Sequence, residues 1–333
     1  MRAFVTSPPG GWSNTKLTEV ERRVGRPDEV LVKICAVGLN PADNFLIEGK
    51  YPGGPKPPFT VGRDACGIVV QGDATGHWKA GDVVVALQST TTDLQYGTLC
   101  DEQWIAAENL ARKPANWSDA EAAGAPLVYQ TAWKALVDVG GLTRGQTVVI
   151  TGASGGVGLA AIQLARGCGA TVIALSRSVE KQRRLLDVGA HHVFSPEDPQ
   201  LKQNIFDQLK IKGVDLVIEN VGGSSLSTAV HLLGVHGRVC VVGVLAGVEA
   251  SIPIPALMFK RISIQGVLVT DDSPQKAQAA WTSIVAAMQA TRDRPIIDSR
   301  FSLENVRDAF NKLGGDVFGK VVVQLDEFKP DRP

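Results

Sequence analysis

The sequence lacks an excess of charge of either sign, and it lacks any long apolar run. Lysine and arginine together number 34, as do aspartate and glutamate, so no net field would draw the chain to nucleic acid or to an anionic membrane. No run of about 18 apolar residues occurs, and the N-terminus shows no apolar segment typical of a signal peptide. We therefore expect a cytoplasmic protein with neither nucleic acid nor a membrane as a partner.

Cysteine is scarce and scattered. The chain has 5 cysteines, none in C-x-x-C spacing, and each stands among apolar residues or glycines. Because the number is odd and the spacing irregular, neither a disulfide framework nor a cysteine-rich metal site is indicated. We expect most of them to be buried, reduced thiols. They are Cys35, Cys66, Cys100, Cys168 and Cys240.

What the chain does have is a glycine-rich turn at residues 148–158, Val-Val-Ile-Thr-Gly-Ala-Ser-Gly-Gly-Val-Gly. An apolar strand leads into the turn and a helix is predicted over 156–167, as in a dinucleotide pyrophosphate site rather than an ordinary strand-to-helix connection. Gly152 permits the tight turn, Gly155 lets the backbone approach a phosphate, and Gly158 lets the helix pack against the strand. The candidate pyrophosphate contacts are Gly152, Ser154, Gly155, Gly156 and Val157.

The residues after the second strand, 170–175, bear on which dinucleotide binds. A site that prefers NAD has Asp or Glu there, against the ribose 2′-hydroxyl. This chain has Ser176 and Arg177, with Lys181 shortly after, and a hydroxyl with a guanidinium can bind a 2′-phosphate. The sequence therefore favours NADPH over NADH; the alternative is that these cations only solvate an exposed helix start.

The pattern of the chain changes near residue 125, and 333 residues suit two domains. After Pro126, strands and helices alternate, which is typical of a doubly wound parallel sheet. We predict an α/β plus β chain, with a β-barrel domain over 1–125 and 271–333 and a Rossmann domain over 126–270. The barrel prediction rests on short strand-like runs separated by Gly, Pro and Asp turns, at residues 29–36, 67–71, 82–87 and 99–105.

Several short motifs carry a resemblance to a known family. They are GLNPAD at 38–43, GRDACG at 62–67, AGDVV at 80–84, YQTA at 129–132, the glycine turn, and GKVV at 319–322. On them the chain resembles, over nearly its whole length, the zinc-independent quinone oxidoreductases of the medium-chain dehydrogenase/reductase superfamily. The resemblance implies a GroES-like barrel, a Rossmann domain, an active site between the two, and a homodimer that pairs the edge strands of two Rossmann sheets.

The resemblance also bears on metal, because many enzymes of the superfamily hold a catalytic zinc with thiolate, imidazole or carboxylate ligands. Where those enzymes place a cysteine, a histidine and a later cysteine, this chain has Asn40, Arg63 and Leu127. An arginine would repel a cation, and residues 88–99 lack the cysteines of a structural zinc lobe. We therefore expect no metal, and a hydride acceptor that is electrophilic by itself, either a quinone or an α,β-unsaturated carbonyl.

The candidate catalytic residues lie in the first domain. Tyr51 resembles the catalytic tyrosine of related enoyl-thioester reductases, although it could equally be an aromatic anchor for its loop. Asn40 is expected nearby, with an amide that can donate to a substrate carbonyl, while Asp43 is expected to cap the helical turn that follows. For Arg63 we expect first an ion pair with Asp64 or Asp43, and alternatively a position facing the cleft.

The remaining site residues follow from topology and from the resemblance. Ligands of parallel sheets lie at the carboxyl ends of the strands, and each glycine or side chain predicted there could also serve simple packing. The topological candidates are Asn220, Gly243, Val244, Leu268 and Val269. The resemblance adds Tyr129, as a catalytic candidate, and Thr131, Phe318 and Lys320, as cofactor contacts.

Taken together, the residues predict a zinc-free, NADPH-dependent oxidoreductase that acts on a small quinone or enone. Three alternatives stay open, and one of them, an alcohol dehydrogenase, would be revealed by bound zinc. The other two are a 2-enoyl-thioester reductase and an NADPH-binding protein with little turnover, since binding and catalysis depend on different residues.

Overall fold

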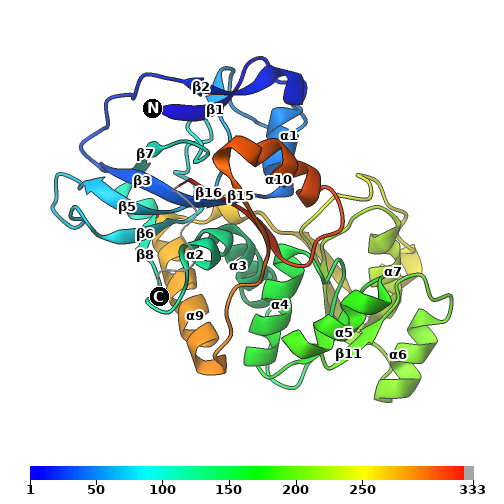
Figure 1. Cartoon of the computed structure of the whole chain (residues 1–333). Helices are drawn as coiled ribbons and strands as arrows, with labels where there is room; N and C mark the ends of the chain where they lie inside the picture. Colours follow the sequence, from blue (N-terminus) through cyan, green and yellow to red (C-terminus); the bar gives the residue numbers. More distant parts are fainter. Residues whose placement is uncertain (326–333) are drawn as a thin grey trace. The chain divides into compact units, whose positions relative to one another are not determined.

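The computed structural model describes residues 1–325, which fall into two compact units (Figure 1). Unit 1 consists of Met1–Leu127, Thr270–Thr282 and the residues from Arg294 onward; unit 2 consists of Val128–Val269 and Ser283–Asp293. The long helix α9 (Pro274–Thr291) begins in unit 1 and ends in unit 2. Residues 283–293, expected in the first domain, therefore belong to the second unit.

Unit 1 is a β domain. Its strands are β1 (Arg2–Thr6), β2 (Thr15–Glu19), β3 (Glu29–Gly38), β4 (Phe59–Thr60), β5 (Cys66–Gln71), β6 (Val83–Ala86), β7 (Glu102–Ala106), β8 (Leu110–Arg112), β15 (Ile297–Ser302) and β16 (Lys320–Gln324). Within the described residues they form a seven-stranded sheet in the order β15-β16-β3-β5-β6-β8, with β7 paired to β3, and a three-stranded sheet in the order β2-β1-β4. All of the pairs are antiparallel except β15 with β16.

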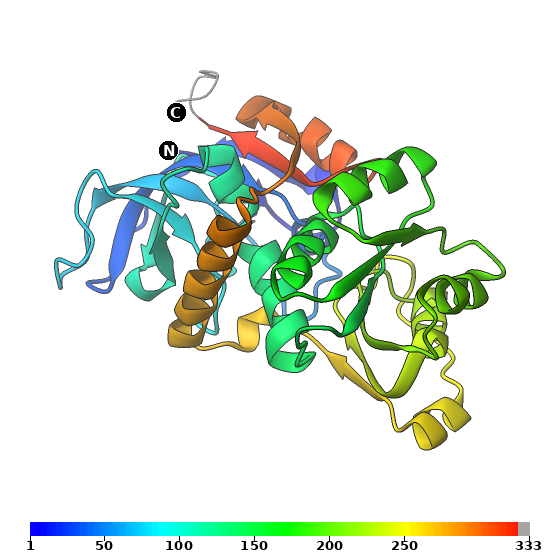
Figure 2. The same ribbon diagram turned by 90° about the horizontal axis from the view of Figure 1, so that it is seen from below.

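Three helices cover the core of unit 1: α1 (Pro41–Ile47), α2 (Asp119–Gly124) and α10 (Val306–Leu313). In α10 the buried residues Val306, Ala309 and Phe310 are three and four positions apart, so they lie on one face of the helix. That face packs against β15 and β16 (Figure 2). The end of β3 and the start of β16, where the polar cluster described below is found, are thereby held by a packed core.

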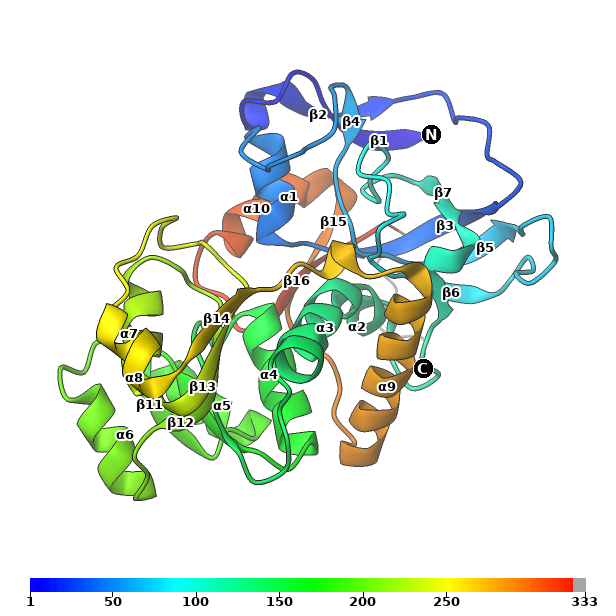
Figure 3. The same ribbon diagram turned by 180° about the vertical axis from the view of Figure 1, so that it is seen from behind.

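Unit 2 is a doubly wound α/β domain. Its strands are β9 (Thr147–Ile150), β10 (Thr171–Leu175), β11 (His192–Phe194), β12 (Val214–Glu219), β13 (Leu233–Val241) and β14 (Ser263–Gly266). They are parallel throughout, in the order β11-β10-β9-β12-β13-β14, and Figure 3 shows β14 beside β13 at the end of this sheet. In order of sequence this is 3-2-1-4-5-6, the strand order of the Rossmann fold.

The helices of unit 2 connect these strands. They are α3 (Pro126–Trp133), which starts at the unit boundary and continues as a π-turn over Lys134–Val139, then α4 (Gly156–Gly167), α5 (Val179–Val188), α6 (Leu201–Leu209), α7 (Ser224–Leu232) and α8 (Ile254–Lys260). The central strand β9 is buried along its whole length, as an apolar strand covered on both faces must be. Among residues 1–325, no helix combines the length and the apolar character that crossing a membrane requires.

Candidate active site

The glycine turn of unit 2 joins β9 to α4, as predicted. Gly152 has a φ of 53°, a conformation that favours glycine, and Gly155 is the N-cap of α4. A Cβ on Gly158 would lie 2.6 Å from the backbone of Ala153, so this glycine is needed for packing. A Cβ on Gly155 would meet nothing closer than the Gly152 oxygen at 3.5 Å. The backbone at Gly155, beside the helix N-terminus, is therefore not crowded, and a phosphate could bind there.

The end of β10 presents an exposed cation. Ser176 is buried, and its backbone carbonyl accepts a hydrogen bond from Gln182 Nε2 at 2.7 Å. Arg177 is exposed and has no partner within the described part of the chain. Ser178 caps α5 by accepting from the Lys181 backbone N–H at 3.3 Å, a cap that the sequence analysis did not assign. The Arg177 guanidinium is thus available to an anion, as a 2′-phosphate site requires.

At the carboxyl end of β12, Asn220 is fixed in place with one acceptor unused. Its backbone N–H donates to Thr151 Oγ1 at 2.9 Å, and its Nδ2 donates to the Thr151 carbonyl at 2.8 Å. Its Oδ1 is buried and has no partner in the described structure. A buried carbonyl oxygen without a donor is costly, so this atom fits a ligand that supplies one, such as a hydroxyl or an amide of a dinucleotide.

Glu219, which sequence reasoning missed, holds the adjoining turn. This fully buried carboxylate accepts from the N–H groups of Val221 and Gly222, both at 2.9 Å, and from Ser225 Oγ at 2.9 Å. A carboxylate that ends an apolar strand just before a glycine pair was the signal available in the sequence. Gly243 also has a packing role, because a Cβ there would lie 2.2 Å from the backbone carbonyl oxygen of Asn220.

The local structure at other predicted contacts of unit 2 differs in part from the expectation. Strand β14 ends at Gly266, so Leu268 and Val269 do not end a strand; Leu268 is 50% exposed and Val269 is buried. Val244 is 47% exposed. Tyr129 and Thr131 lie inside α3 and are buried. The Tyr129 hydroxyl donates to Gln163 Oε1 at 2.5 Å, which commits its proton within unit 2.

Unit 1 contains a closed polar cluster formed by Asn40, Asp64 and Lys320. Strands β3 and β16 pair with Gly38 opposite Val322, and this antiparallel register places Lys320 opposite Asn40. Lys320 Nζ donates to Asn40 Oδ1 at 2.6 Å and to Asp64 Oδ2 at 3.4 Å. Asn40 Nδ2 donates to Asp64 Oδ2 at 3.0 Å and to the Gly38 carbonyl at 3.1 Å.

The cluster corrects two expectations. Both amide protons of Asn40 are donated inside unit 1, so its amide is not available to a substrate carbonyl. The ammonium group of Lys320, expected at the cofactor, is likewise used inside unit 1, while the adjacent Phe318 N–H donates to Asp298 Oδ1 at 2.7 Å. Burial raises the pKa of Asp64, although Lys320 opposes this, and burial lowers the pKa of Lys320.

Asp43 caps α1, as predicted. Its Oδ2 accepts from the Asn40 backbone N–H at 2.8 Å, while its Oδ1 is buried without a partner in the described structure. Burial raises the pKa of Asp43 to about 6, although the charge of Arg63 opposes this rise. Asp43 is therefore a structural residue that carries a titratable group inside unit 1.

Arg63 and Tyr51 form the second polar group of unit 1. Arg63 Nη2 donates to the Tyr51 hydroxyl at 3.0 Å, and the guanidinium carbon lies 4.8 Å from the centre of the tyrosine ring. Arg63 is only 6% exposed, and its Nε is buried without a partner. No carboxylate of residues 1–325 is within salt-bridge distance of it, so the expected ion pair with Asp64 or Asp43 is wrong. Asp64 already accepts from Asn40, Lys320 and the Leu127 N–H. Asp43 accepts from the Asn40 N–H with one oxygen and acts on Arg63 through its charge only, beyond ion-pair distance.

The residues at the positions where related enzymes bind zinc do not fit a metal ion. The Lys320 ammonium is bonded to Asn40, the Arg63 guanidinium lies at the second ligand position, and Leu127 stands at the third, with its backbone N–H donating to Asp64 at 2.9 Å. Two cations and an apolar side chain would oppose Zn²⁺. Within the described residues there is also no group of three His, Cys, Asp or Glu side chains that could hold a metal.

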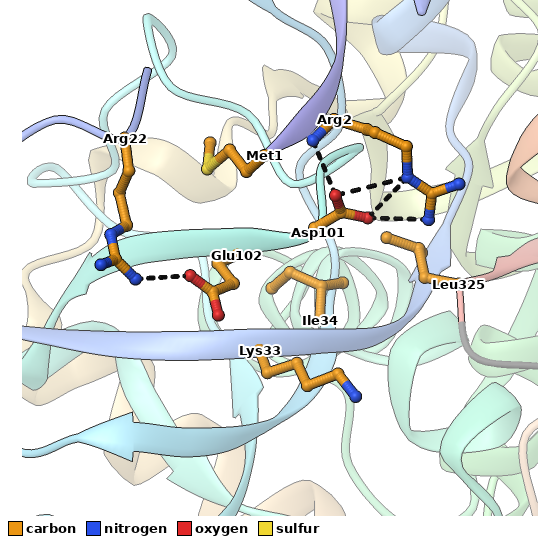
Figure 4. Close-up of a pocket in the computed structure, with 8 residues that line it drawn as sticks. All are labelled: Met1, Arg2, Arg22, Lys33, Ile34, Asp101, Glu102 and Leu325. Carbon is orange, nitrogen blue, oxygen red and sulfur yellow. Dashed lines mark hydrogen bonds and ion pairs between the residues drawn. The ribbon is translucent and has the colours of Figure 1, made fainter. Parts of the chain in front are cut away.

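A surface hollow of about 660 Å³ in unit 1 is not the active-site candidate. Figure 4 shows its charged lining, in which Arg2 contacts Asp101 at 2.9 Å and Arg22 contacts Glu102 at 2.7 Å. Each guanidinium and each carboxylate of the lining therefore already has a partner. The hollow shares no lining residue with either polar group described above.

Known proteins are similar to the chain over nearly its whole length. Residues 26–117 match the family model "Alcohol dehydrogenase GroES-like domain", and residues 156–286 match "Zinc-binding dehydrogenase". The chain is 33% identical to a quinone oxidoreductase of Lama guanicoe and 32% identical to that of Homo sapiens, in each case over 98% of both chains.

Solved structures show the same fold. An alcohol dehydrogenase superfamily protein from Novosphingobium aromaticivorans has a TM-score of 0.87 at 28% identity, and an NAD-dependent alcohol dehydrogenase has one of 0.86 at 26%; each match covers 98% of this chain and 100% of the other. The unit 1 strands thus form the GroES-like domain and the unit 2 sheet the Rossmann domain that the motifs predicted. On this full-length similarity the chain is an oxidoreductase that belongs to the quinone oxidoreductase family of the medium-chain dehydrogenase/reductase superfamily.

Proposed function

We propose that the chain is a zinc-free, NADPH-dependent reductase of quinones or α,β-unsaturated carbonyls. The observation that carries this proposal is the composition of the position where related enzymes bind zinc. There, Lys320 Nζ lies 2.6 Å from Asn40 Oδ1, and Arg63 donates to the Tyr51 hydroxyl at 3.0 Å. Hydrogen-bond donors and fixed positive charge thus replace a Lewis acid. The similarity to relatives named quinone oxidoreductase supports the same acceptor class.

The dinucleotide would be held by residues of unit 2. The uncrowded backbone at Gly155 and the N-terminus of α4 fit the pyrophosphate, and the unpartnered Oδ1 of Asn220 fits a donor on the cofactor. The exposed, partnerless Arg177 fits a 2′-phosphate, and no carboxylate stands beside Ser176 to repel one. When bound, the nicotinamide supplies a hydride.

The acceptor would be held by Tyr51 of unit 1. The phenol oxygen accepts from Arg63, which leaves the phenol's own proton to be donated to an acceptor oxygen. Asn40 has no such proton, because both of its amide protons are engaged, and the Tyr129 hydroxyl donates to Gln163. Tyr51 is therefore the donor that the geometry of the described residues supports best.

The test is NADPH oxidation by metal-free protein against a small set of acceptors: 1,4-benzoquinone, cyclohex-2-enone, a 2-enoyl-CoA and a simple aldehyde, with NADH in parallel. We expect turnover of the quinone or the enone, with NADPH preferred. Turnover confined to the enoyl-CoA would favour the thioester reductase. NADPH binding without turnover of any acceptor would favour a binding protein, and activity that depends on added Zn²⁺ would contradict the proposal.

We further propose that two copies pair through the free edge of β14. This strand ends the sheet of unit 2, and α8, which precedes it in the chain, has no buried residue. The six side chains Leu245, Val248, Ile254, Met258, Phe259 and Leu268 are between 50% and 85% exposed. In sedimentation velocity we expect a dimer that Phe259→Asp converts to a monomer of unchanged Tm. A wild-type monomer would contradict this pairing.

A reducing compartment, the cytoplasm, is proposed as the place of action. All 5 cysteines are unpaired, and all but Cys168 are buried. Burial raises the pKa of Cys100 and of Cys240 to about 12, which keeps these thiols protonated and unreactive. Such cysteine usage is typical of a compartment that keeps thiols reduced.

A further inference from the structure

Arg63 is a buried guanidinium without a counter-ion in contact. It is 6% exposed, and its only hydrogen bond among the described residues goes to the Tyr51 hydroxyl. Its Nε, also buried, has no partner. Burying a charge in this way is expensive unless a partner arrives. A planar guanidinium best fits oxygen with negative charge, so the arrangement favours a ligand that develops an oxyanion.

The backbone on both sides of Arg63 is held firmly. Gln88 Nε2 donates to the Arg63 carbonyl at 3.1 Å, and Thr98 Oγ1 donates to the Asp64 carbonyl at 2.9 Å. Gly62 has a φ of 103°, and a Cβ there would lie 2.7 Å from Thr98 Oγ1. Because the side chain starts from a fixed backbone, its unpaired state is a property of the fold rather than of a loose surface arginine.

Tyr51 presents the other half of the arrangement. It is partly buried, and its ring packs against the hydrophobic core of unit 1, which fixes the direction of the hydroxyl. The hydroxyl oxygen accepts from Arg63 Nη2 and donates to nothing in the described structure. The Tyr51 hydroxyl thus has a proton that it can donate. The Arg63 guanidinium lies beside the phenol oxygen that would carry the negative charge after that donation.

We propose that Arg63 and Tyr51 act as one acid, in which Tyr51 gives a proton to the acceptor oxygen and Arg63 stabilises the resulting phenolate, and that this acid serves α,β-unsaturated carbonyls more than quinones. The inference rests on the proposed function and narrows its substrate class. A quinone is a strong electrophile and takes up hydride readily, and one proton from solvent, in net terms, then completes the hydroquinone. An enone is a weaker electrophile, and its reduction depends on stabilisation of the enolate that forms.

The proton and electron balance is as follows for an enone. The hydride forms a C–H bond at the β-carbon, the C=C π electrons shift, and negative charge reaches the carbonyl oxygen. The Tyr51 O–H bond breaks, its proton forms the O–H bond of the enol, and its electron pair stays on the phenol oxygen beside Arg63 Nη2. A proton from solvent then restores the phenol, and the enol becomes the saturated ketone in water. One hydride and one proton have been added in total.

The experiment compares Tyr51→Phe, Arg63→Met and Arg63→Lys with wild type, using cyclohex-2-enone and 1,4-benzoquinone with NADPH. We expect Tyr51→Phe to lower kcat for the enone by about 100-fold or more and kcat for the quinone by a factor at least about 10-fold smaller. Arg63→Met should lower kcat for the enone by about 10-fold or more, with KM little changed, and Arg63→Lys should recover part of the loss. Arg63 is a positioning residue in this scheme, so the recovery by lysine separates its charge from a merely structural role.

A second readout needs neither cofactor nor turnover. The absorbance of 4-nitrophenolate, a stable oxyanion, reports binding to the protein alone. We expect Arg63→Met to weaken that binding by about 10-fold or more, as loss of a charged hydrogen bond should. The matched control is Tyr96→Phe. Tyr96 also has a guanidinium, that of Arg23, 4.8 Å from its ring centre, but it is 43% exposed and belongs to neither polar group, so both readouts should stay at the wild-type value.

The outcomes separate this inference from the function on which it rests. If wild type reduces the enone but the Tyr51 and Arg63 variants lose enone and quinone turnover equally, or lose neither, the inference is overturned and the proposed function stands. Unchanged 4-nitrophenolate binding in Arg63→Met overturns the role of the arginine. If wild type turns over no acceptor, both fail. Equal Tm values in all variants show that the losses do not come from unfolding; if Arg63→Met does not fold, Arg63→Lys carries the same comparison.

Discussion

Arg63 and Asp64 are adjacent in the sequence and both are buried, yet only Asp64 has a complete set of hydrogen-bond partners. Asp64 accepts hydrogen bonds from Lys320, Asn40 and the Leu127 N–H, so its charge is balanced within unit 1. Arg63 has one neutral partner, Tyr51, and an unpaired Nε. Polar groups whose partners are complete stabilise a fold, whereas a fixed charge with incomplete partners is available to a ligand. We therefore infer that Asp64 stabilises the fold and that Arg63 takes part in the reaction.

The largest expected effect comes from breaking the complete cluster. Asp64→Asn would leave the buried Lys320 ammonium without its counter-ion, and we expect the free energy of unfolding in urea to fall by about 3–5 kcal/mol. The matched control is Arg22→Met, which removes an exposed ion pair with Glu102 and should change stability by less than about 1 kcal/mol. A loss in Asp64→Asn no larger than in this control would show that the cluster does not stabilise the fold.

A smaller effect on the free energy of unfolding should come from Asp43, whose Oδ1 has no hydrogen-bond partner among the described residues. Burial raises its pKa to about 6 in the folded protein, from an ordinary value of 3.8. The folded state therefore holds the proton more tightly, and the resulting stabilisation is complete below pH 3.8 and lost as the pH rises through about 6. The difference between these two pKa values corresponds to on the order of 3 kcal/mol.

The variant that tests this is Asp43→Asn, which keeps an acceptor for the Asn40 N–H but cannot ionise. We expect wild type to lose stability relative to the variant as the pH rises from about 4 to 7, because only wild type must ionise a buried group. The measurement is urea unfolding of both proteins across that range. A difference that does not depend on pH would mean that Asp43 has the same pKa in the folded and unfolded states.

Much of unit 2 could be predicted because its signals are local. The glycine turn and the strand before it indicate α4, which lies at the predicted residues 156–167. Helix α8 was not predicted, because its short, almost continuously apolar sequence with a proline in the first turn shows no helical periodicity. Strand β15 (Ile297–Ser302) was missed because polar residues interrupt its pattern.

The site was less predictable because its contacts are long-range. Lys320 meets Asn40 across 280 residues of sequence, through the register of β16 against β3. Sequence proximity suggested an ion pair for Arg63, but Asp43 is taken by the N-terminus of α1 and Asp64 by the Leu127 N–H and by Lys320. Partners supplied by backbone groups and by distant strands leave no pattern in a single sequence.

Arg177 of unit 2 extends the comparison to an exposed cation, and the smallest effect is expected there. Like Arg63 it forms no ion pair within the described residues. Arg177 is exposed to solvent, however, so an unpaired charge costs little free energy there. A 2′-phosphate would supply the anionic partner that Arg177 lacks. Arg177→Met should therefore weaken NADPH binding by about 1.5–3 kcal/mol, or roughly 10- to 150-fold, and leave NADH binding nearly unchanged. Calorimetric titration of each dinucleotide measures both constants, with Arg184→Met, on the same helix α5, as the matched control. Equal weakening of NADH and NADPH would remove Arg177 from the phosphate site and leave it as a solvated charge at the start of α5.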